Sequence, residues 1–382
     1  MQKLFYRDLK IGVLGGGQLG RMLLQAAIDY NLYIEILDSD SRCPCSMLTR
    51  NFHLGYLTDF ETVYRFGEDL DMITIEIENV NVEALEALEK EGKIVYPQPH
   101  ILRMIQDKRL QKQWFIDNDI PTSAFVLTEK KEDLLALTHL LPAVHKLGKG
   151  GYDGHGVQVL DNESDIRKAF DAPAVLEDKV AIQKELAVIV ARNPQGDVSV
   201  FPLVEMVFHP TANLVEYLMS PAEVPAEIAA EAEKIATNIV NKLGYVGLLA
   251  VELFWDKEGK LWVNELAPRP HNSGHHTIRS CATSQYEQHL RAILGLPLGA
   301  PTLLHPAAML NLLGETGHSG KVFYEGVEAA LAIEGVYPHF YGKTHTKPFR
   351  KMGHVTILDE NKEQLIQKVR KVQEVLKVLT KS

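Results

Sequence analysis

Cysteine is scarce in this sequence, with 3 residues in 382. Cys43 and Cys45 are separated by one proline, a spacing that fits neither a CxxC redox pair nor a zinc knuckle, and Cys281 is isolated. This usage argues against a disulfide framework. A reducing compartment is the simplest interpretation, so we expect a cytoplasmic protein.

Long apolar runs and an excess of basic charge are also lacking. No stretch approaches the ~20 apolar residues of a membrane span, and charged residues within positions 1–8 interrupt the apolar core that a signal peptide needs. The net charge is −10, whereas nonspecific binding of nucleic acid needs a basic face. The 15 histidines form no cluster with metal-ligand spacing. We therefore expect neither a membrane nor a nucleic acid as partner.

The length and composition indicate a globular protein with two or three domains. Hydrophobic residues make up 46% and charged residues 24%, which are ordinary values. A proline-containing stretch at residues 96–99 and a change to short strand patterns after residue 295 suggest three units. Their expected ranges are 1–105, 106–296 and 297–382, and the last is a small α+β domain.

Strand and helix patterns alternate in the first unit. An apolar strand at residues 10–14 runs into Gly-Gly-Gly-Gln-Leu-Gly at residues 15–20, a helix is predicted at residues 22–30, and a strand at residues 32–37 ends at Asp38. This is the G-x-G-x-x-G dinucleotide pattern with an acidic residue about twenty positions on. The alternation predicts a doubly wound, Rossmann-like α/β domain. The motif alone is a weak signal, so an NAD-dependent oxidoreductase stays an alternative.

Two glutamates close the next strand of this unit. Glu76 and Glu78 lie at the end of a strand predicted at residues 72–77, and ligands bind at the carboxyl ends of strands in open α/β sheets. For Glu76, capping of the next helix is an equal alternative. Glu78 is the better candidate for substrate contact.

A glycine-rich loop follows a predicted strand in the second unit. Residues 148–156 contain five glycines, and Lys146 precedes them. Backbone N–H groups of such a loop can surround polyphosphate oxygens, while a fixed lysine supplies positive charge. A hairpin with glycines for turn geometry is the alternative.

The rest of the second unit is predicted to contain further strands and helices. A helix over residues 101–118 is broken near residues 106–107, and helices are expected at residues 130–139 and 163–170. A long helix is predicted at residues 225–243, where apolar residues recur on one helical face. Residues 175–180 have the form of an edge strand that gives backbone hydrogen bonds to a purine.

A predicted hairpin carries two glutamates. Residues 251–254 and 261–265 alternate apolar and polar side chains around a turn, so Glu252 and Glu265 should be neighbours. With Asn264 they form an oxygen-rich cluster that suits Mg²⁺. Ordinary solvent-facing glutamates are the alternative. The polar segment after the hairpin contains residues suited to orienting a small oxyanion, namely Arg269, His271 and Asn272.

The third unit contains short strands and a helix predicted at residues 362–379. Lys343, Arg350 and Lys351 are three of the cations that lie within nine residues of an acidic chain. A sugar phosphate needs such a place. A solvated turn is the alternative.

Taken together, these parts resemble the ATP-grasp superfamily, which has a lysine, a glycine loop, Glu-x-x-Val, and Glu and Asn-Glu on late paired strands in this order. The chain is similar to the 5-(carboxyamino)imidazole ribonucleotide synthase family of purine biosynthesis over essentially its whole length. Four runs carry this resemblance: Gly-Gly-Gly-Gln-Leu-Gly-Arg, Gly-Gly-Tyr-Asp-Gly-x-Gly, Asn-Glu-Leu-Ala-Pro-Arg-x-His-Asn-Ser-Gly-His and Arg-Lys-Met-Gly-His. The third is the most specific.

The resemblance implies a central ATP-grasp module and a reaction of 5-aminoimidazole ribonucleotide, bicarbonate and ATP. It implies that ATP is bound by Lys108, Lys146, Gly151, Tyr152, Asp153, Gly154, His155, Gly156, Val157, Glu177, Asp178, Lys179, Val180, Glu185, Asn264 and Glu265. It implies that the nucleotide substrate is bound by Gln18, Leu19, Glu78, Tyr152, Lys343, Arg350 and Lys351. Mg²⁺ would be held by Glu252 and Glu265, and the catalytic residues would be Asp153, Arg269, His271 and Asn272.

This sequence departs from the family at one loop position, where His155 replaces the usual arginine. A sister ATP-grasp ligase that uses formate or an amino acid as acyl donor, and a noncatalytic nucleotide-binding regulator, are the remaining alternatives. A homodimer is expected.

Overall fold

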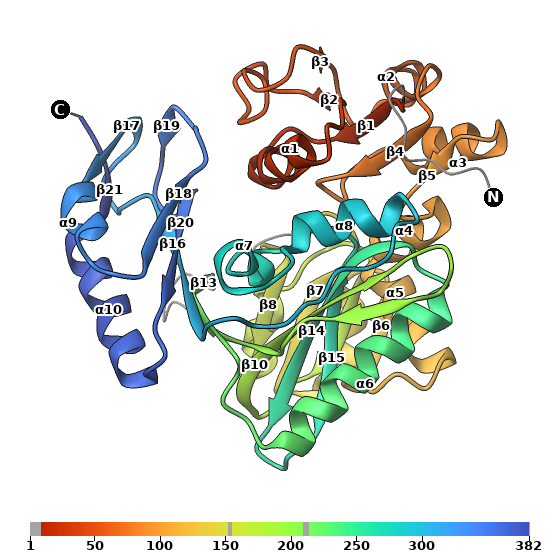
Figure 1. Cartoon of the computed structure of the whole chain (residues 1–382). Coiled ribbons are helices and arrows are strands. Elements are labelled where there is room, and N and C mark those ends of the chain that lie inside the picture. Colours follow the sequence, from red (N-terminus) through yellow and green to blue (C-terminus); the bar gives the residue numbers. More distant parts are fainter. Residues whose placement is uncertain (1–8, 152–154, 209–213, 382) are drawn as a thin grey trace.

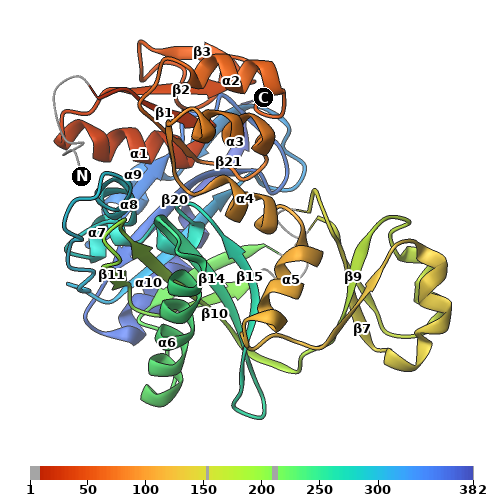
Figure 2. The same cartoon turned by 90° about the vertical axis from the view of Figure 1, so that its right-hand side faces the viewer.

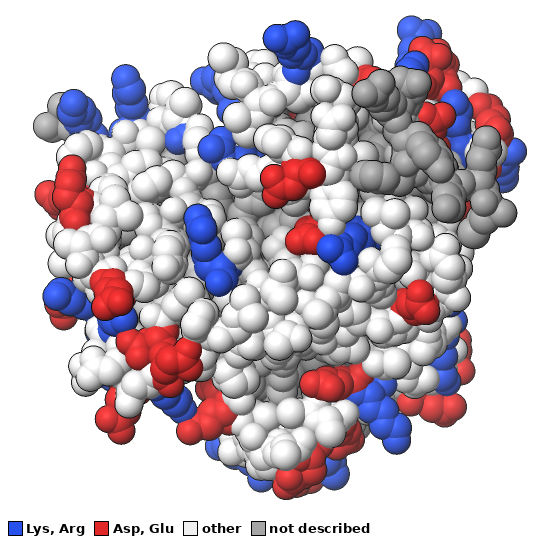
Figure 3. Space-filling model, in the orientation of Figure 1, with Lys and Arg blue, Asp and Glu red and all other residues white. Residues whose placement is uncertain are grey.

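The computed structural model describes residues 9–151, 155–208 and 214–381, which form three parts (Figure 1). The N-terminal part lies above the central part, and the C-terminal part lies beside it. No helix within the described ranges is long and apolar enough to cross a membrane. On the face shown in Figure 3, the basic side chains drawn in colour are scattered among acidic ones.

The N-terminal part is the predicted doubly wound domain. Its parallel sheet has the order β3-β2-β1-β4-β5. Helices pack on both faces, because α1 shares one hydrophobic core with β1 and β2 while α2 and α3 share another with β4. The bounds are β1 Ile11–Leu14, α1 Gln18–Asp29, β2 Ile34–Asp38, β3 Phe52–Leu54, α2 Phe60–Gly67, β4 Met72–Ile75, α3 Val82–Lys90 and β5 Ile94–Val95.

Two helices, α4 (Pro99–Ile105) and α5 (Lys108–Asp117), lead into the central part. The predicted break between them is confirmed. Asp107 is the N-cap of α5, and its side chain accepts a hydrogen bond from the backbone N–H of Arg109. The cap starts a new helix at Lys108 and fixes where that lysine lies.

A four-stranded antiparallel sheet projects as a separate lobe (Figure 2). Its order is β6-β9-β7-β8, with β6 Phe125–Thr128, β7 Ala143–Leu147, β8 Val157–Leu160 and β9 Ala174–Asp178. The edge-strand prediction was wrong, since β9 pairs on both sides. The helices predicted at residues 130–139 and 163–170 are instead short 3₁₀ segments, η1 Lys131–Ala136, η2 Thr138–Leu140 and η3 Glu163–Lys168.

The largest sheet has nine antiparallel strands and joins the central and C-terminal parts. Its main path is β15-β14-β10-β12-β13-β16-β20-β18, and β11 pairs with β10. Strands β13 and β16 hydrogen-bond across the junction. The strands are β10 Ile182–Arg192, β11 Val198–Val200, β12 Val204–Phe208, β13 Val215–Ser220, β14 Gly247–Asp256, β15 Leu261–Ala267, β16 Ala307–Leu313, β18 Val336–Phe340 and β20 Lys351–Leu358.

Helices cover this sheet. The long helix α6 (Ala226–Leu243) buries the apolar face expected from its 3.6-residue periodicity against β10, β14 and β15. The helix α8 (Gln285–Ile293) begins at the N-cap Ser284 and packs against α1, which joins the central and N-terminal parts. Two shorter segments, η4 (Asn272–Gly274) and α7 (Thr277–Ser280), connect β15 to α8.

The C-terminal part also has a small sheet of order β19-β17-β21. It contains β17 Gly320–Glu325, α9 Val327–Leu331, β19 His345–Thr346, α10 Lys362–Val375 and β21 Lys377–Thr380. The prediction of one helix over residues 362–379 was wrong at its end. The helix stops at Val375 because the last residues form β21, which pairs with β17 and buries Val378.

Candidate active site

The β14–β15 hairpin brings the two predicted metal carboxylates together. Glu252 and Glu265 are direct partners across the strands, which confirms that they are neighbours. The register shifts beside them, because Leu253 pairs with Val263 and leaves Asn264 as an extra residue on β15. Such a bulge re-aims side chains. Asn264 and Glu265 are consecutive, and yet both contact polar groups of the same site.

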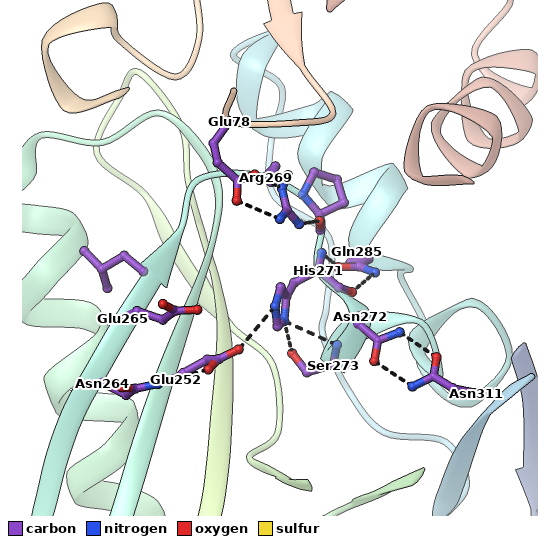
Figure 4. Close-up of polar contacts among 12 residues, drawn as sticks. Glu78, Glu252, Asn264, Glu265, Arg269, His271, Asn272, Ser273, Gln285 and Asn311 are labelled. Carbon is purple, nitrogen blue, oxygen red and sulfur yellow. Dashed lines mark hydrogen bonds and ion pairs between the residues drawn. The ribbon is translucent and has the colours of Figure 1, made fainter. Parts of the chain in front are cut away.

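The two carboxylates have different surroundings (Figure 4). Glu265 forms an ion pair with Lys108, which outweighs burial and holds the pKa of Glu265 below its usual range. Among the described residues, the side-chain contacts of Glu252 are with neutral groups, Asn264 Nδ2 at 3.3 Å and His271 Nε2 at 3.4 Å. Burial, with the nearby charges of Glu265 and Glu185, raises the pKa of Glu252 to about 8. At neutral pH Glu265 is therefore ionised, whereas Glu252 is largely protonated in this arrangement.

A buried group of charges lies next to the hairpin. Lys146 Nζ on β7 donates to Asn264 Oδ1 at 2.8 Å and to Glu177 Oε2 at 3.1 Å. The same Glu177 oxygen is 2.9 Å from Nζ of Lys112 on α5. These two lysines outweigh burial and lower the pKa of Glu177. The Glu177 carboxylate is thus occupied by the two lysines. A nucleotide would therefore contact the backbone of the residues after Glu177.

The glycine-rich segment begins beside α5. The Lys108 N–H donates to the Gly148 carbonyl at 2.8 Å, and the Gly156 carbonyl accepts from Leu147 N at 2.9 Å. Gly156 has φ +84°, and a Cβ there would lie 3.0 Å from the Gly151 Cα. Val157 opens β8 opposite Lys146. Of the remaining loop residues His155 is exposed, whereas Tyr152, Asp153 and Gly154 lie outside the described residues.

Other predicted nucleotide residues surround this lobe. Glu185 on β10 lies beside Phe254 of β14, and burial raises its pKa to about 7. Asp178 and Lys179 are exposed at the end of β9, and Lys179 pairs with Asp161 at 2.7 Å. Backbone pairing of β9 in its own sheet ends at Asp178, so residues 178–180 follow the last paired position.

The segment after β15 connects the hairpin to the N-terminal part. Arg269 forms a two-point ion pair with Glu78, with Nη2 and Oε1 3.1 Å apart (Figure 4). Burial alone would raise the pKa of Glu78, but Arg269 holds it below its usual value. The predicted substrate contact Glu78 and the predicted oxyanion ligand Arg269 therefore meet at one point.

His271 has a defined tautomer. Its Nδ1 accepts from Ser273 N at 3.4 Å and contacts Ser273 Oγ at 2.8 Å. The proton of the neutral ring consequently lies on Nε2, which faces Glu252. Burial, together with the charges of Arg269 and Lys351, lowers the pKa of His271 to about 3. His271 is thus a neutral ring whose Nε2–H faces Glu252, one of the two predicted metal ligands.

Asn272 makes a contact that the sequence did not indicate. Its amide exchanges two hydrogen bonds with Asn311 on β16, at 2.9 and 3.1 Å (Figure 4). This reciprocal pair attaches the segment after β15 to the C-terminal part. The Asn272 side chain is therefore already engaged on both its nitrogen and its oxygen.

The glycine motif of the N-terminal part binds carboxylates of the protein itself. Asp38 Oδ2 accepts from Gly16 N at 2.6 Å, and Glu76 Oε2 accepts from Gly20 N at 2.9 Å. Glu76 therefore caps the first turn of α1, which precedes it in the chain, whereas the next helix, α3, is capped by Asn81. Burial raises the pKa of Glu76 to about 7. The Asp38 carboxylate is already hydrogen-bonded to the glycine loop. This removes the main support for the NAD-dependent alternative, which needs that acidic residue to bind the dinucleotide. Gln18 is the first residue of α1, and the side chain of the buried Leu19 belongs to the core.

The three C-terminal cations lie around the start of β20. Lys343 Nζ donates to the Lys351 carbonyl at 2.8 Å, and Arg350 Nη1 donates to the His345 carbonyl at 2.6 Å. The positive charge of Lys351 lowers the pKa of His271, and that of Lys343 acts against the raised pKa of Glu76. Lys343 and Lys351 are therefore within electrostatic reach of both other parts of the chain.

Comparison with known proteins agrees with this geometry. Residues 9–106 match the ribonucleotide synthetase preATP-grasp domain, residues 113–286 the ATP-grasp domain, and residues 307–368 the phosphoribosylaminoimidazole carboxylase C-terminal domain. The N5-carboxyaminoimidazole ribonucleotide synthase of Bacillus subtilis is 35% identical over 375 residues, covering 96% of each chain. The chain belongs to the N5-carboxyaminoimidazole ribonucleotide synthase family. The expected fold class is thereby confirmed.

Members and relatives of the synthase family differ in length. The chloroplastic phosphoribosylaminoimidazole carboxylase of Vigna aconitifolia is 40% identical over 364 residues, and the match covers 92% of this chain but 64% of that protein. The N5-carboxyaminoimidazole ribonucleotide synthetase structure from Thermotoga maritima is 40% identical with a TM-score of 0.91, covering 98% of this chain and 100% of that one. The Aspergillus clavatus synthase in complex with ADP and 5-aminoimidazole ribonucleotide is 30% identical with a TM-score of 0.86, covering 96% and 97%.

Proposed function

We propose that this protein carboxylates 5-aminoimidazole ribonucleotide with bicarbonate and ATP, giving N5-carboxyaminoimidazole ribonucleotide, ADP and phosphate in purine biosynthesis. The observation that carries this proposal is the meeting of all three parts at one site. The Glu252–Glu265 pair and the lysines of the ATP-grasp domain continue through Arg269 to Glu78 of the N-terminal domain. Through His271 and Asn272 they also reach the C-terminal domain.

ATP lies between the four-stranded lobe and the β14–β15 hairpin in this proposal. Lys108 and Lys146 supply positive charge for its phosphates, and the glycine loop from Gly151 to Val157 covers them. The backbone of residues 177–180 faces the base, and Glu185 faces the ribose. The Glu177 side chain is not assigned to ATP, because its carboxylate already binds two lysines.

The donor set on the hairpin fits Mg²⁺. Glu252, Glu265 and Asn264 offer only oxygen ligands, which a hard cation prefers. Within the part of the chain that the structure describes, no group of three or more His, Cys, Asp or Glu residues has the arrangement of a metal site. Two carboxylates that leave room for phosphate oxygens and water are what Mg²⁺ in nucleotide sites uses. When bound, the ion would neutralise charge that develops on the transferred phosphoryl group.

The remaining groups fit the chemistry of bicarbonate. Bicarbonate is a poor electrophile, and its phosphorylation gives carboxyphosphate, which delivers an activated carboxyl group or CO₂ to a nearby amine. Arg269 can bind such an oxyanion through two parallel hydrogen bonds if it exchanges Glu78 for the ligand. His271 holds Glu252 in place, and Asn272 holds the segment to the C-terminal domain. Asp153 on the loop would accept the proton of the amine.

The substrate phosphate is assigned to the C-terminal cations Lys343, Arg350 and Lys351. The amine end then points to Glu78 and to Tyr152 and Asp153, while the backbone at Gln18 and Leu19 lies along the ribose. Domain boundaries at residues 105 and 296 and a homodimer are further parts of this proposal. Three free, buried cysteines are consistent with a cytoplasmic site of action.

A phosphate-release assay tests the proposed function. ATP and Mg²⁺ are supplied with bicarbonate and 5-aminoimidazole ribonucleotide, singly and together, and formate replaces bicarbonate in a parallel series. Full turnover only with bicarbonate and the aminoimidazole nucleotide is the expected result. Turnover with formate in place of bicarbonate would assign the chain a different acyl donor.

A further inference from the structure

Lys112 is a buried lysine that the proposed ATP site does not use. It lies one turn after Lys108 on α5, and 2% of its surface is exposed. Its Nζ donates to Thr122 Oγ1 at 2.6 Å and to Ser123 Oγ at 3.1 Å, and lies 2.9 Å from Glu177 Oε2. An ammonium group without solvent needs such partners, because burial of an unpaired charge is costly.

The partner carboxylate is shared. Glu177 Oε2 also accepts from Lys146 Nζ at 3.1 Å and from Ser123 Oγ at 2.9 Å. Two buried cations therefore share one buried anion, and the group carries a net charge of about +1 when both lysines are protonated. Without the charge of Lys112, Glu177 would neutralise Lys146. Little positive electrostatic potential would then remain where the ATP phosphates are proposed to bind.

We propose that Lys112 is a positioning residue that balances the charge of Glu177 and thereby leaves the charge of Lys146 available to the phosphates of ATP. This inference rests on the proposed function, in which ATP binds over Lys146. Lys112 itself contacts no ligand in this arrangement, since Glu177, Thr122 and Ser123 surround its ammonium group.

The arrangement has a consequence for pH. Burial lowers the pKa of Lys112 to about 8, against about 10.4 for a free lysine. The charges that face it are Glu177 from β9, Lys146 from β7 and Lys108 of its own helix, while Thr122 and Ser123 ahead of β6 are uncharged. As pH rises through about 8, Lys112 loses its proton and the group approaches neutrality. ATP affinity is then expected to fall above this pH.

The test is direct measurement of ATP binding with Mg²⁺, without bicarbonate or nucleotide substrate, from about pH 7 to about pH 9.5. Three variants are compared with the unmodified chain. Lys112→Met removes the charge, and Lys112→Met with Glu177→Gln removes both charges and again leaves Lys146 unneutralised. Lys257→Met, at the exposed turn between β14 and β15, is the control for loss of one positive charge.

At pH 7 we expect Kd for ATP to rise on the order of tenfold in Lys112→Met, to recover most of that loss in the double variant, and to stay unchanged in the control. The pH-dependent rise of Kd above about pH 8 should be larger in the unmodified chain than in Lys112→Met, which keeps the titrating carboxyl groups Glu185 and Glu252 but not the lysine. A double variant that binds as weakly as Lys112→Met, or unchanged binding by Lys112→Met, overturns the inference.

Two further results separate failure of the proposed function from failure of the role of Lys112. If the unmodified chain does not bind ATP, the proposed function itself fails. If Lys112→Met does not fold, as thermal unfolding would show, Glu177→Gln alone decides. It removes the anion that Lys112 balances, so ATP should bind at least as tightly as to the unmodified chain, and weaker binding rejects the role of Lys112.

Discussion

At the scale of single residues, most charges of the site are balanced within the protein. Glu265 pairs with Lys108, Glu78 with Arg269, and Glu177 with Lys112 and Lys146. In the proposed site, ATP and bicarbonate are themselves anionic, so they would compete for Lys108, Lys146 and Arg269. Binding would then exchange one partner for another, and it would free the Glu265 carboxylate to bind a cation.

The first prediction concerns Glu265. Replacement by Gln removes one charge from the proposed Mg²⁺ site and should reduce ATP turnover by about 100-fold or more, since loss of one charge-stabilising contact costs ~3 kcal/mol. Turnover is measured at saturating Mg²⁺. Glu258→Gln, in the exposed turn of the same hairpin, is the control and should behave like the parent. Parent-like turnover of Glu265→Gln would remove this residue from the metal site.

Sequence patterns predicted which residues belong to the site better than they predicted which residues those side chains contact. Alternation in the hairpin was enough to place Glu252 beside Glu265. It did not show the bulge at Asn264, because one extra residue in a strand leaves no mark in composition. Lys112 was missed for a similar reason. One lysine spaced four residues from another on a helix looks like a solvated face, and only the tertiary fold places Glu177 against it.

At the scale of elements, the proposed nucleotide site depends on the glycines between β7 and β8. Gly156 combines positive φ with close approach to Gly151, so a side chain is unfavourable for two separate reasons.

Gly156→Ala is predicted to raise the KM for ATP by about tenfold or more, because the backbone between β7 and β8 must shift. Gly92→Ala is the matched control, since Gly92 also has positive φ (+92°) but no atom within 4 Å of the added Cβ. Steady-state kinetics with varied ATP checks both variants. Equal effects in the two would mean that general backbone strain, and not the geometry of this loop, is responsible.

Elements with local signals were predicted well, and elements defined by distant partners were not. The break at Asp107 and the apolar stripe of α6 are local, and both were confirmed. The interior position of β9 depends on β6 and β7, which lie about 30 to 50 residues before it in the chain, so no local pattern distinguishes it from an edge strand. Residues 377–380 became β21 for the same reason, since their partner is β17.

At the scale of the whole molecule, neighbouring histidine rings lie where the central and C-terminal parts meet, and His275 and His354 among them are buried. The ring of His354 on β20 lies 4.8 Å from that of His275 and 4.5 Å from that of His339. Burial, followed by neighbouring histidines, lowers the pKa of His275 and His354, and burial lowers that of His339 to about 4. These groups are therefore neutral in the folded protein at pH values where the unfolded chain takes up protons.

The sign of the pH dependence follows from this difference. The folded pKa of each histidine lies below the unfolded value of about 6.5, so stability is full above about pH 6.5 and is lost as pH falls below it. Each such group contributes a slope of about 1.4 kcal/mol per pH unit in that range. His354→Phe keeps a ring in the stack and should make the fall in unfolding temperature between about pH 7 and pH 5 shallower. His100→Gln, at an exposed site on α4, should leave the slope unchanged.

In the proposed function, ATP and the substrate phosphate are bound by different parts of the molecule, and the last prediction tests this division. Lys343, Arg350 and Lys351 belong to the C-terminal part, whereas Lys108 and Lys146 belong to the central one. If the C-terminal cations hold the substrate phosphate, Arg350→Ala should raise the KM for 5-aminoimidazole ribonucleotide by about tenfold or more, since it removes a charge-assisted hydrogen bond. The KM for ATP should change little, because the proposed ATP site belongs to the central part. Arg370→Ala, exposed on α10 of the same part, is the charge-matched control. The pair of constants decides the assignment. An unchanged KM for the aminoimidazole nucleotide, or parallel changes in both constants, would mean that Arg350 does not hold the phosphate.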